Sequence, residues 1–314
     1  MKTLDQAKYQ GRDFLTFQDY TQEELLYFIE VGRALKAEKK AGIPHPHLAG
    51  KTLGMIFTKS STRTRVSFEV GMWQLGGHAL FLSNRDIQLG RGETVGDTAR
   101  TLSRMVDGVM IRTYSHDEVL ELAEYCSVPV INGLTDLHHP CQVLGDLMTV
   151  QEYKGRIAGL KMTFIGDGGN NMAHSLLYAT KLGMRVTIAS PPGYQPLAEV
   201  VATAEAYAEE NGGSVTIVDD PLEGAAGADV LYTDVWASMG MEEEAAKRQR
   251  DFAGYQINGE TLKAAAPDSI VLHCLPAHRG EEITDEVLDG PHSVVFEEAE
   301  NRLHIEKAIM ALLM

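Results

Sequence analysis

Short runs of apolar, β-branched residues alternate along the chain with stretches in which apolar residues recur every three or four positions. The first pattern is typical of buried strands and the second of helices that cover them. Strands are predicted at 52–57, 79–82, 108–111, 128–131, 160–165, 184–189, 215–218, 230–233 and 270–273. Strands that alternate with helices build parallel sheets with helices on both faces, so the pattern predicts an α/β fold.

Helix signals divide the chain into two halves. Thr21 and Glu24 form a capping box that opens the first helix. Another helix is predicted over 141–154 and ends at Gly155, and we place a domain boundary near this point. Because 314 residues are about twice what one ordinary domain needs, two domains are expected. The amphipathic helix predicted over 298–313 can pack on either of them.

The composition is that of a soluble globular protein, with 44% hydrophobic and 23% charged residues. Its 28 basic and 44 acidic residues give a net charge of −16, which argues against a surface that binds nucleic acid or a membrane. An anionic ligand therefore needs a local basic site. No apolar run reaches the roughly 18 residues of a membrane span, and the charged N-terminal stretch does not resemble a secretory signal. Three cysteines without a C-x-x-C spacing also favour a cytoplasmic protein.

The segment Ser-Ser-Thr-Arg-Thr-Arg at 60–65 follows the first strand, opens a helix and has the components of an anion site. Unpaired N–H groups at a helix start carry partial positive charge, hydroxyls add donors, and guanidinium groups match phosphate oxygens. A plain helix cap is the alternative, but one Ser or Thr satisfies it. Two arginines beside several hydroxyls exceed that need, so phosphate is the favoured ligand.

Further polar clusters follow other predicted strands. They are Arg112, 138–142, 166–171, 234–240 and 273–282, with a last cluster at 300–302. Ligands of open α/β sheets bind outside the carboxyl ends of the strands, so these clusters are expected to share one crevice between the halves. Each also has an ordinary interpretation, such as a surface ion pair for the arginine and solvated imidazoles for the adjacent histidines. Those histidines do not easily converge on one zinc ion.

The glycine-rich segment 166–171 suggests a dinucleotide-binding turn, and a nucleotide-binding module is therefore a hypothesis of a different class. Two features oppose it. Asn171 takes the place of the third glycine, and Ser190 ends the next strand where an NAD-binding protein usually has a carboxylate. A smaller polar ligand and a simple capped turn remain as interpretations of this segment.

Taken in order, the motifs S-T-R-T-R, H-P-C-Q, D-x-W-x-S-M-G and H-C-L-P resemble those of the aspartate/ornithine carbamoyltransferase family, its ornithine members in particular. The resemblance runs from about residue 14 to the C-terminus. It implies two α/β domains and a C-terminal helix that returns to the first of them. The expected bounds are 1–150 for a carbamoyl-phosphate-binding domain, 151–296 for an ornithine-binding domain and 297–314 for the returning helix.

The resemblance also implies roles for individual residues. The carbamoyl-phosphate-binding set is Ser61, Thr62, Arg63, Thr64, Gln88, Arg112, His139, Gln142, Cys274, Leu275 and Arg302. The ornithine-binding set is Asn171, Asp234, Ser238 and Met239, where Asn171 rather than Asn170 is a choice of register. Catalytic roles fall to Arg112, His139, Asp234, Cys274 and Arg302. Gln88 matches a position that reaches into a neighbouring subunit's site, so a homotrimer or a multiple of trimers is expected.

The implied reaction transfers the carbamoyl group of carbamoyl phosphate to the δ-amine of L-ornithine and yields L-citrulline and phosphate. Asp234 stands where an aspartate-specific relative carries a basic residue, and its carboxylate suits the α-ammonium group of ornithine. A carbamoyltransferase for another amine, putrescine or N-acetylornithine, is the alternative. Neither a metal nor an organic cofactor is expected, because carbamoyl phosphate is already activated and positioning with charge stabilisation is enough.

Overall fold

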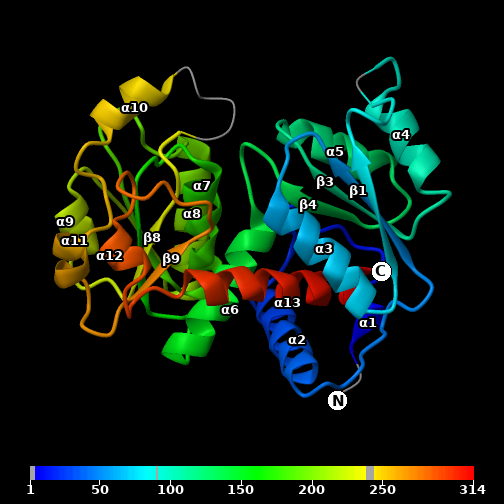
Figure 1. The fold of residues 1–314 in the computed structure, drawn as a ribbon, viewed down its shortest axis with the longest axis horizontal. Helices are drawn as coiled ribbons and strands as arrows, with labels where there is room; N and C mark the ends of the chain where they lie inside the picture. Colours follow the sequence, from blue (N-terminus) through cyan, green and yellow to red (C-terminus); the bar gives the residue numbers. More distant parts are fainter. Residues whose placement is uncertain (1–3, 90, 238–243) are drawn as a thin grey trace. The chain divides into compact units, whose positions relative to one another are not determined.

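Two parallel β-sheets organise the chain in the computed structural model, which describes residues 4–89, 91–237 and 244–314 (Figure 1). The chain divides into unit 1, Met1–Met148 with Glu300–Met314, and unit 2, Thr149–Ala299. It leaves the first unit within one helix and re-enters it within the last helix. The predicted α/β fold class is thereby confirmed, including the return of the C-terminal helix to the first unit.

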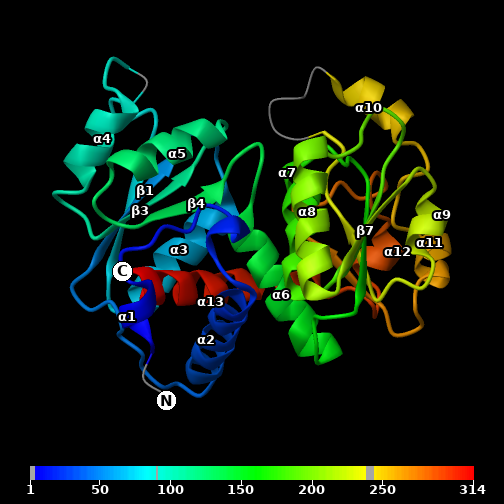
Figure 2. The same cartoon turned by 180° about the vertical axis from the view of Figure 1, so that it is seen from behind.

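Unit 1 contains a four-stranded parallel sheet with the strand order β2-β1-β3-β4. The strands are β1 (Thr52–Phe57), β2 (His78–Ser83), β3 (Gly108–Arg112) and β4 (Val130–Leu134). The helices are α1 (Gln6–Tyr9), α2 (Gln22–Lys40), α3 (Thr62–Gln74), α4 (Val95–Leu102), α5 (His116–Tyr125), α6 (Pro140–Lys154) and α13 (Val295–Leu313), with a 3-10 turn at Phe17–Asp19. Helices α4 and α5 cover one face of the sheet, and α3 and α13 lie on the other (Figures 1 and 2).

The last strand of this sheet differs from the sequence prediction. The apolar run ends at Ile131, but β4 continues through Asn132 and Gly133 to Leu134. Backbone pairing explains the extension, because the N–H of Asn132 donates to the carbonyl of Phe14 and the N–H of Phe14 donates to Val130. A short N-terminal segment thus supports a strand whose second half lacks an apolar pattern.

The C-terminal helix α13 is more deeply buried than its amphipathic pattern indicates. Every residue from His304 to Met314 is buried, including polar side chains such as Lys307. Two glycines permit this close packing: a Cβ at Gly32 of α2 would lie 3.2 Å from Ile305, and one at Gly71 of α3 would lie 2.8 Å from Met310. The helix is therefore part of the core of unit 1.

Unit 2 contains a five-stranded parallel sheet with the order β7-β6-β5-β8-β9. The strands are β5 (Lys161–Ile165), β6 (Arg185–Ala189), β7 (Ser214–Val218), β8 (Val230–Thr233) and β9 (Ile270–His273). The helices are α7 (Asn171–Leu177), α8 (Ala198–Asn211), α9 (Pro221–Ala225), α10 (Ala245–Asp251), α11 (Gly259–Ala264) and α12 (Asp285–Leu288), with a 3-10 turn at Tyr178–Leu182. Helices α9, α11 and α12 pack on one face, and α7 and α8 lie on the other (Figure 1).

Each sheet has one place where the strand order reverses direction. It lies between β1 and β3 in unit 1 and between β5 and β8 in unit 2. Loops that leave neighbouring strands on opposite faces of a sheet open a crevice at such a point, and α/β proteins bind ligands there. The predicted clusters at 60–65, Arg112, 166–171 and Asp234 lie at the ends of these strands, whereas 138–142 follows β4, 273–282 begins at the end of β9 and 300–302 lies in α13. Across 4–89, 91–237 and 244–314, no helix is long and apolar enough to cross a membrane.

Candidate functional site

The first half-site lies in unit 1 at the start of α3, directly after β1. Ser61 caps the helix, and its side-chain oxygen accepts a hydrogen bond from the N–H of Thr64. Thr62 is exposed and Arg63 is half-buried, so both can reach a ligand at this helix end. The first turn carries basic rather than acidic side chains, which leaves the positive end of the helix available to an anion.

Buried Arg302 joins this helix start to α6. Its guanidinium donates to the hydroxyl of Thr64 at 3.3 Å and to the side-chain oxygen of Gln142. The same guanidinium donates twice to Glu306, at 2.9 and 2.6 Å, while the amide of Gln142 donates to Asp146 at 2.7 Å. The sequence analysis missed Glu306 and Asp146. Their spacing of four from Arg302 and Gln142 on a helix was the available signal.

His139 lies among the arginines of this half-site. It is buried, and burial is the main cause that lowers its pKa well below the ordinary 6.5. The charges of Arg302, Arg112 and Arg63 lower the pKa further. The imidazole is therefore neutral at physiological pH and acts as a hydrogen-bond donor or acceptor rather than as an acid.

Lys59 is another residue that the sequence analysis missed. Its side chain is buried, forms an ion pair with Asp136 and lies 4.2 Å from the ring centre of Tyr114. These partners belong to the loops after β4 and β3, whereas Lys59 follows β1. Backbone bonds reinforce the connection, since the N–H of Thr58 donates to the carbonyl of Arg112. One lysine thus holds together the three loops that carry the half-site.

Gln88 is placed differently from the other carbamoyl-phosphate candidates of unit 1. It is exposed in the loop between β2 and α4, and its carbonyl accepts from the N–H of Arg91 at 2.8 Å. The hydrogen bonds that Arg302 makes to Thr64 and Gln142 do not include Gln88. Its predicted role in a neighbouring subunit's site stays a prediction.

The second half-site lies in unit 2 around Asp234, the residue directly after β8. One carboxylate oxygen accepts from the amide of Asn170 at 3.0 Å. The other accepts from the N–H of Val235 at 2.8 Å and from the thiol of Cys274 at 3.2 Å. Asp234 is 8% exposed, so a nearly buried negative charge is held in one orientation by three donors.

The turn after β5 brings Asn170 rather than Asn171 against this carboxylate. Asn170 caps α7 and accepts from the N–H of Met172 at 2.7 Å. Asn171 is the first residue of that helix and is half-buried beside it. Asn171 therefore stays a predicted ornithine contact, and Ser238 and Met239 lie outside the described residues.

Cys274 and Leu275 follow β9 in a turn whose backbone is unusual. Leu275 has φ +57°, and the Leu275–Pro276 peptide bond is cis. Ligand atoms of Asp234, His273 and Cys274 lie within 4.8 Å of one another, close enough to hold a metal ion. Hydrogen bonds engage each of these groups: the thiol of Cys274 donates to Asp234, and the ring nitrogens of His273 bond to Glu282 and to the N–H of Leu275.

Arg248 of α10 is a further residue missed by the sequence analysis. It is buried and donates to Asp167 in the turn after β5 and to the carbonyl of Trp236 at 2.8 Å. Burial raises the pKa of the Asp167 carboxyl, and the Arg248 charge opposes that rise. The ion pair fixes the turn that carries Asn170.

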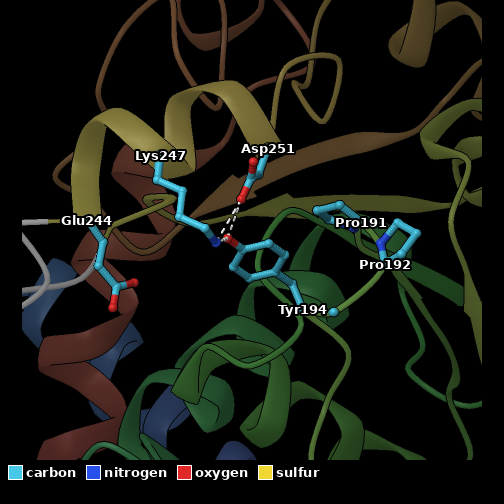
Figure 3. Close-up of a pocket in the computed structure, with 7 residues that line it drawn as sticks. Pro191, Pro192, Tyr194, Glu244, Lys247 and Asp251 are labelled. Carbon is cyan, nitrogen blue, oxygen red and sulfur yellow. Dashed lines mark hydrogen bonds and ion pairs between the residues drawn. The ribbon is translucent and has the colours of Figure 1, made fainter.

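A pocket of about 480 Å³ lies elsewhere in unit 2, beside α10 (Figure 3). It contains Lys247, Tyr194 and Asp251, whose polar atoms bond to one another: the ammonium donates to the phenol at 2.7 Å, and the phenol donates to the carboxylate at 2.6 Å. None of the predicted site residues lines it. Because its polar groups satisfy one another, we do not assign it a ligand.

The chemistry of the two half-sites is complementary. The unit 1 half-site combines a helix start, several guanidinium groups and a neutral imidazole, which together can bind a phosphate and polarise a carbonyl group. The unit 2 half-site presents an oriented carboxylate and backbone carbonyls, which can bind an ammonium group and an amide N–H.

Comparisons with known proteins agree over nearly the whole chain. Residues 12–152 match the family model described as aspartate/ornithine carbamoyltransferase, carbamoyl-P binding domain. Residues 158–313 match the Asp/Orn binding domain of the same family.

Individual relatives are similar over nearly their full lengths. The ornithine carbamoyltransferase of Carboxydothermus hydrogenoformans is 58% identical and covers 98% of this chain and 99% of its own. The anabolic ornithine carbamoyltransferase of Pyrococcus furiosus is 56% identical over 97% of this chain and 96% of its own length. The solved ornithine carbamoyltransferase from Pyrococcus furiosus superposes with a TM-score of 0.95 over 97% of both chains at 56% identity.

Proposed function

Because this chain belongs to the aspartate/ornithine carbamoyltransferase family, we infer that it transfers the carbamoyl group of carbamoyl phosphate to the δ-amine of L-ornithine, with L-citrulline and phosphate as products. It is a transferase of arginine metabolism. The observation that carries this conclusion is an identity of 55–58% over nearly the full length with proteins named ornithine carbamoyltransferase. The position of Asp234 adds support, since a carboxylate there suits an α-ammonium group and opposes the extra carboxylate of aspartate.

The phosphate end of carbamoyl phosphate is proposed to bind at the N-terminal turn of α3 and to the arginines around it. Hydroxyl and N–H donors of Ser61, Thr62, Arg63 and Thr64 supply hydrogen bonds, and Arg112 and Arg302 add charge. The support is the convergence of these groups in unit 1 of a protein whose net charge is −16. A focused positive pocket is what a phosphate dianion requires in so acidic a chain.

For the carbamoyl end, His139, Gln142, Thr64 and Arg112 are the proposed contacts. A donor to the carbonyl oxygen stabilises the tetrahedral oxyanion that forms when the amine attacks, and one such donor typically contributes about 3 to 4 kcal/mol. The lowered pKa of His139 supports a neutral donor in this role. The carbonyl oxygens of Cys274 and Leu275 are the proposed acceptors for the carbamoyl amide nitrogen.

For ornithine, Asp234 is the proposed partner of the α-ammonium group, with Asn171, Ser238 and Met239 around the α-carboxylate. The attacking δ-amine resembles a lysine amine, with a pKa near 10.4. Deprotonating it to the neutral nucleophile at pH 7.5 therefore costs roughly 4 kcal/mol. Cys274 donates to Asp234 and belongs to the proposed group that orients the amine and helps to remove its proton.

A homotrimer, or a multiple of trimers, is the proposed assembly. An exposed apolar surface on α3 and β2 supports it: Trp73 is 77% exposed and Val66 53%, and Phe81 lies on the neighbouring edge strand. Self-association would bury this surface, and Gln88 follows the same strand. The test is the molar mass of Trp73→Glu by light scattering, where a smaller species is expected. Tyr153→Glu, at an exposed aromatic of unit 2, is the control.

A cytoplasmic location is also proposed. Its support is the state of the cysteines, since Cys126, Cys141 and Cys274 are all free thiols, as in proteins of reducing compartments. Cell fractionation with an antibody to the native protein tests it.

The reaction is tested by ureido-product formation from carbamoyl phosphate with ornithine, putrescine, N-acetylornithine or aspartate in parallel. A strong signal with ornithine alone is expected. A signal with another amine would retain the carbamoyl-phosphate half of the proposal and overturn the role of Asp234. No product with any amine would overturn the proposed function.

A further inference from the structure

His273, the first residue of the H-C-L-P motif, has no part in the reaction proposed above, yet both of its ring nitrogens have partners. It ends β9 and is completely buried. The N–H of Leu275 donates to Nδ1 at 2.9 Å, and Nε2 lies 3.1 Å from a carboxylate oxygen of Glu282. Because Nδ1 accepts a hydrogen bond, it carries no proton, so the ring is neutral and donates from Nε2 to Glu282.

Glu282 fixes the far side of the imidazole. Its side chain is completely buried, and the oxygen that accepts from His273 also accepts from the N–H of His278 at 2.5 Å. The backbone of His273 is held as well, since its N–H donates to Glu298 at 2.9 Å. The ring therefore has one orientation, with Nδ1 directed at the backbone two residues later.

That backbone belongs to Leu275, the one non-glycine residue with a positive φ among the described residues. A left-handed conformation costs an ordinary L-residue about 1–2 kcal/mol, so it persists only where its surroundings impose it. An acceptor that captures the N–H two residues later stabilises a turn, as Asx turns do. His273 supplies that acceptor through its ring.

We propose that His273 and Glu282 are positioning residues that hold Leu275 in its left-handed conformation and so fix the carbonyl oxygens of Cys274 and Leu275 for the carbamoyl amide group. The inference rests on the proposed role of those two carbonyls. The imidazole acts through orientation and transfers no proton, because its Nδ1 is occupied by a backbone N–H and its Nε2 by a carboxylate.

The kinetic test compares three variants of the full chain with the parent enzyme. His273→Leu removes the acceptor and is expected to lower kcat/KM for carbamoyl phosphate about a hundredfold, because a displacement of about 1 Å has an effect of that size. The KM for ornithine at saturating carbamoyl phosphate is expected to stay within a few-fold. Glu282→Leu is expected to resemble His273→Leu. Glu282→Gln keeps an oxygen acceptor for both donors and is expected to stay close to the parent enzyme.

A rescue experiment separates positioning from a general contribution to stability. Glycine adopts the left-handed conformation without a steric penalty, so Leu275→Gly in the His273→Leu background is expected to recover part of the lost kcat/KM. Leu275→Gly alone is the control for the missing side chain. If His273 contributed only stability, the double variant would be less active than His273→Leu, and that result would overturn the proposal.

A spectroscopic test is independent of activity. His292 is a matched control in the same unit, because its Nδ1 lies 2.7 Å from the carbonyl oxygen of Ser269, which can only accept, so Nδ1 must carry a proton there. Nitrogen NMR of the labelled protein is expected to show the proton on Nε2 of His273 and on Nδ1 of His292. A proton on Nδ1 of His273 would contradict the geometry.

The inference and the proposed function fail in different ways. A parent enzyme that makes no citrulline would overturn the function. A parent enzyme that makes citrulline, with His273→Leu within twofold of it in kcat/KM for carbamoyl phosphate, would overturn the positioning role alone.

Discussion

The half-sites of the two units occupy equivalent places in similar sheets but have opposite chemistry. Each lies after the carboxyl ends of the strands that flank a reversal of strand order. In unit 1 that place holds Arg63, Arg112 and Arg302, whereas in unit 2 it holds Asp234 and backbone carbonyls. The fold provides the position, and a few side chains there give one half-site cationic groups and the other a carboxylate.

The half-sites also differ in how their groups are held in place. In unit 1, buried Arg302 pairs with Glu306 four residues later on the same helix, and buried Lys59 pairs with the more exposed Asp136 of another loop. Unit 2 places Leu275 in a left-handed backbone conformation and holds it with a neutral histidine. Unit 2 also has a buried ion pair, Arg248 with Asp167, in the turn that carries Asn170. The predictions below test these ways of holding the groups of each half-site in place.

The largest effect is expected from Arg302→Met. It leaves the fully buried Glu306 without its cation, and breaking a buried pair in this way typically costs about 3–5 kcal/mol of the free energy of unfolding. Urea unfolding measures the loss. The double variant Arg302→Met/Glu306→Met should regain most of the stability yet remain inactive with carbamoyl phosphate. A double variant as unstable as the single one would contradict the account of unit 1.

Arg63→Ala should affect catalysis and leave stability nearly unchanged, because Arg63 is only half-buried. A hydrogen bond from a charged donor is worth about 1.5–3 kcal/mol, so kcat/KM for carbamoyl phosphate should fall roughly tenfold to a hundredfold. Arg100→Ala, at an exposed arginine that pairs with Asp97, is the control and should change little. Near-normal kinetics of Arg63→Ala in carbamoyl phosphate would remove it from the phosphate site.

Asp234→Asn tests the other half of the comparison. The variant removes the proposed partner of the α-ammonium group, so kcat/KM for ornithine should fall about tenfold or more while binding of a phosphate analogue survives. Asp251→Asn is the control, because it removes the same charge at an exposed ion pair with Lys247, outside the half-site. It should leave kcat/KM for ornithine unchanged. An unchanged ornithine profile in Asp234→Asn would exclude it from the site.

The sequence predicted the parallel sheets and the polar clusters at the strand ends because both depend on local patterns. Helix α6, which ends at Lys154 just before Gly155, and the capping box of Thr21 with Glu24 were confirmed for the same reason. Lys59 and Arg248 were missed because their partners lie in other segments of the chain. Glu306 and Asp146 were missed although their partners lie four residues away on the same helix. A pattern of apolar and polar positions cannot distinguish a charge in a buried pair from one in solvent.

The smallest effect is expected from pH. Since His139 is neutral in the folded protein and its pKa lies well below 6.5, the unfolded chain takes up a proton there that the folded chain does not as the pH falls below about 6.5. The free energy of unfolding therefore falls with decreasing pH, by up to about 1.4 kcal/mol for each pH unit. His139→Gln cannot titrate, so the difference in unfolding free energy between parent and variant should show this slope from pH 7 to pH 5. A difference that does not vary with pH would mean that His139 is charged in the folded protein, and the carbonyl of carbamoyl phosphate would then meet a cation instead of a neutral donor.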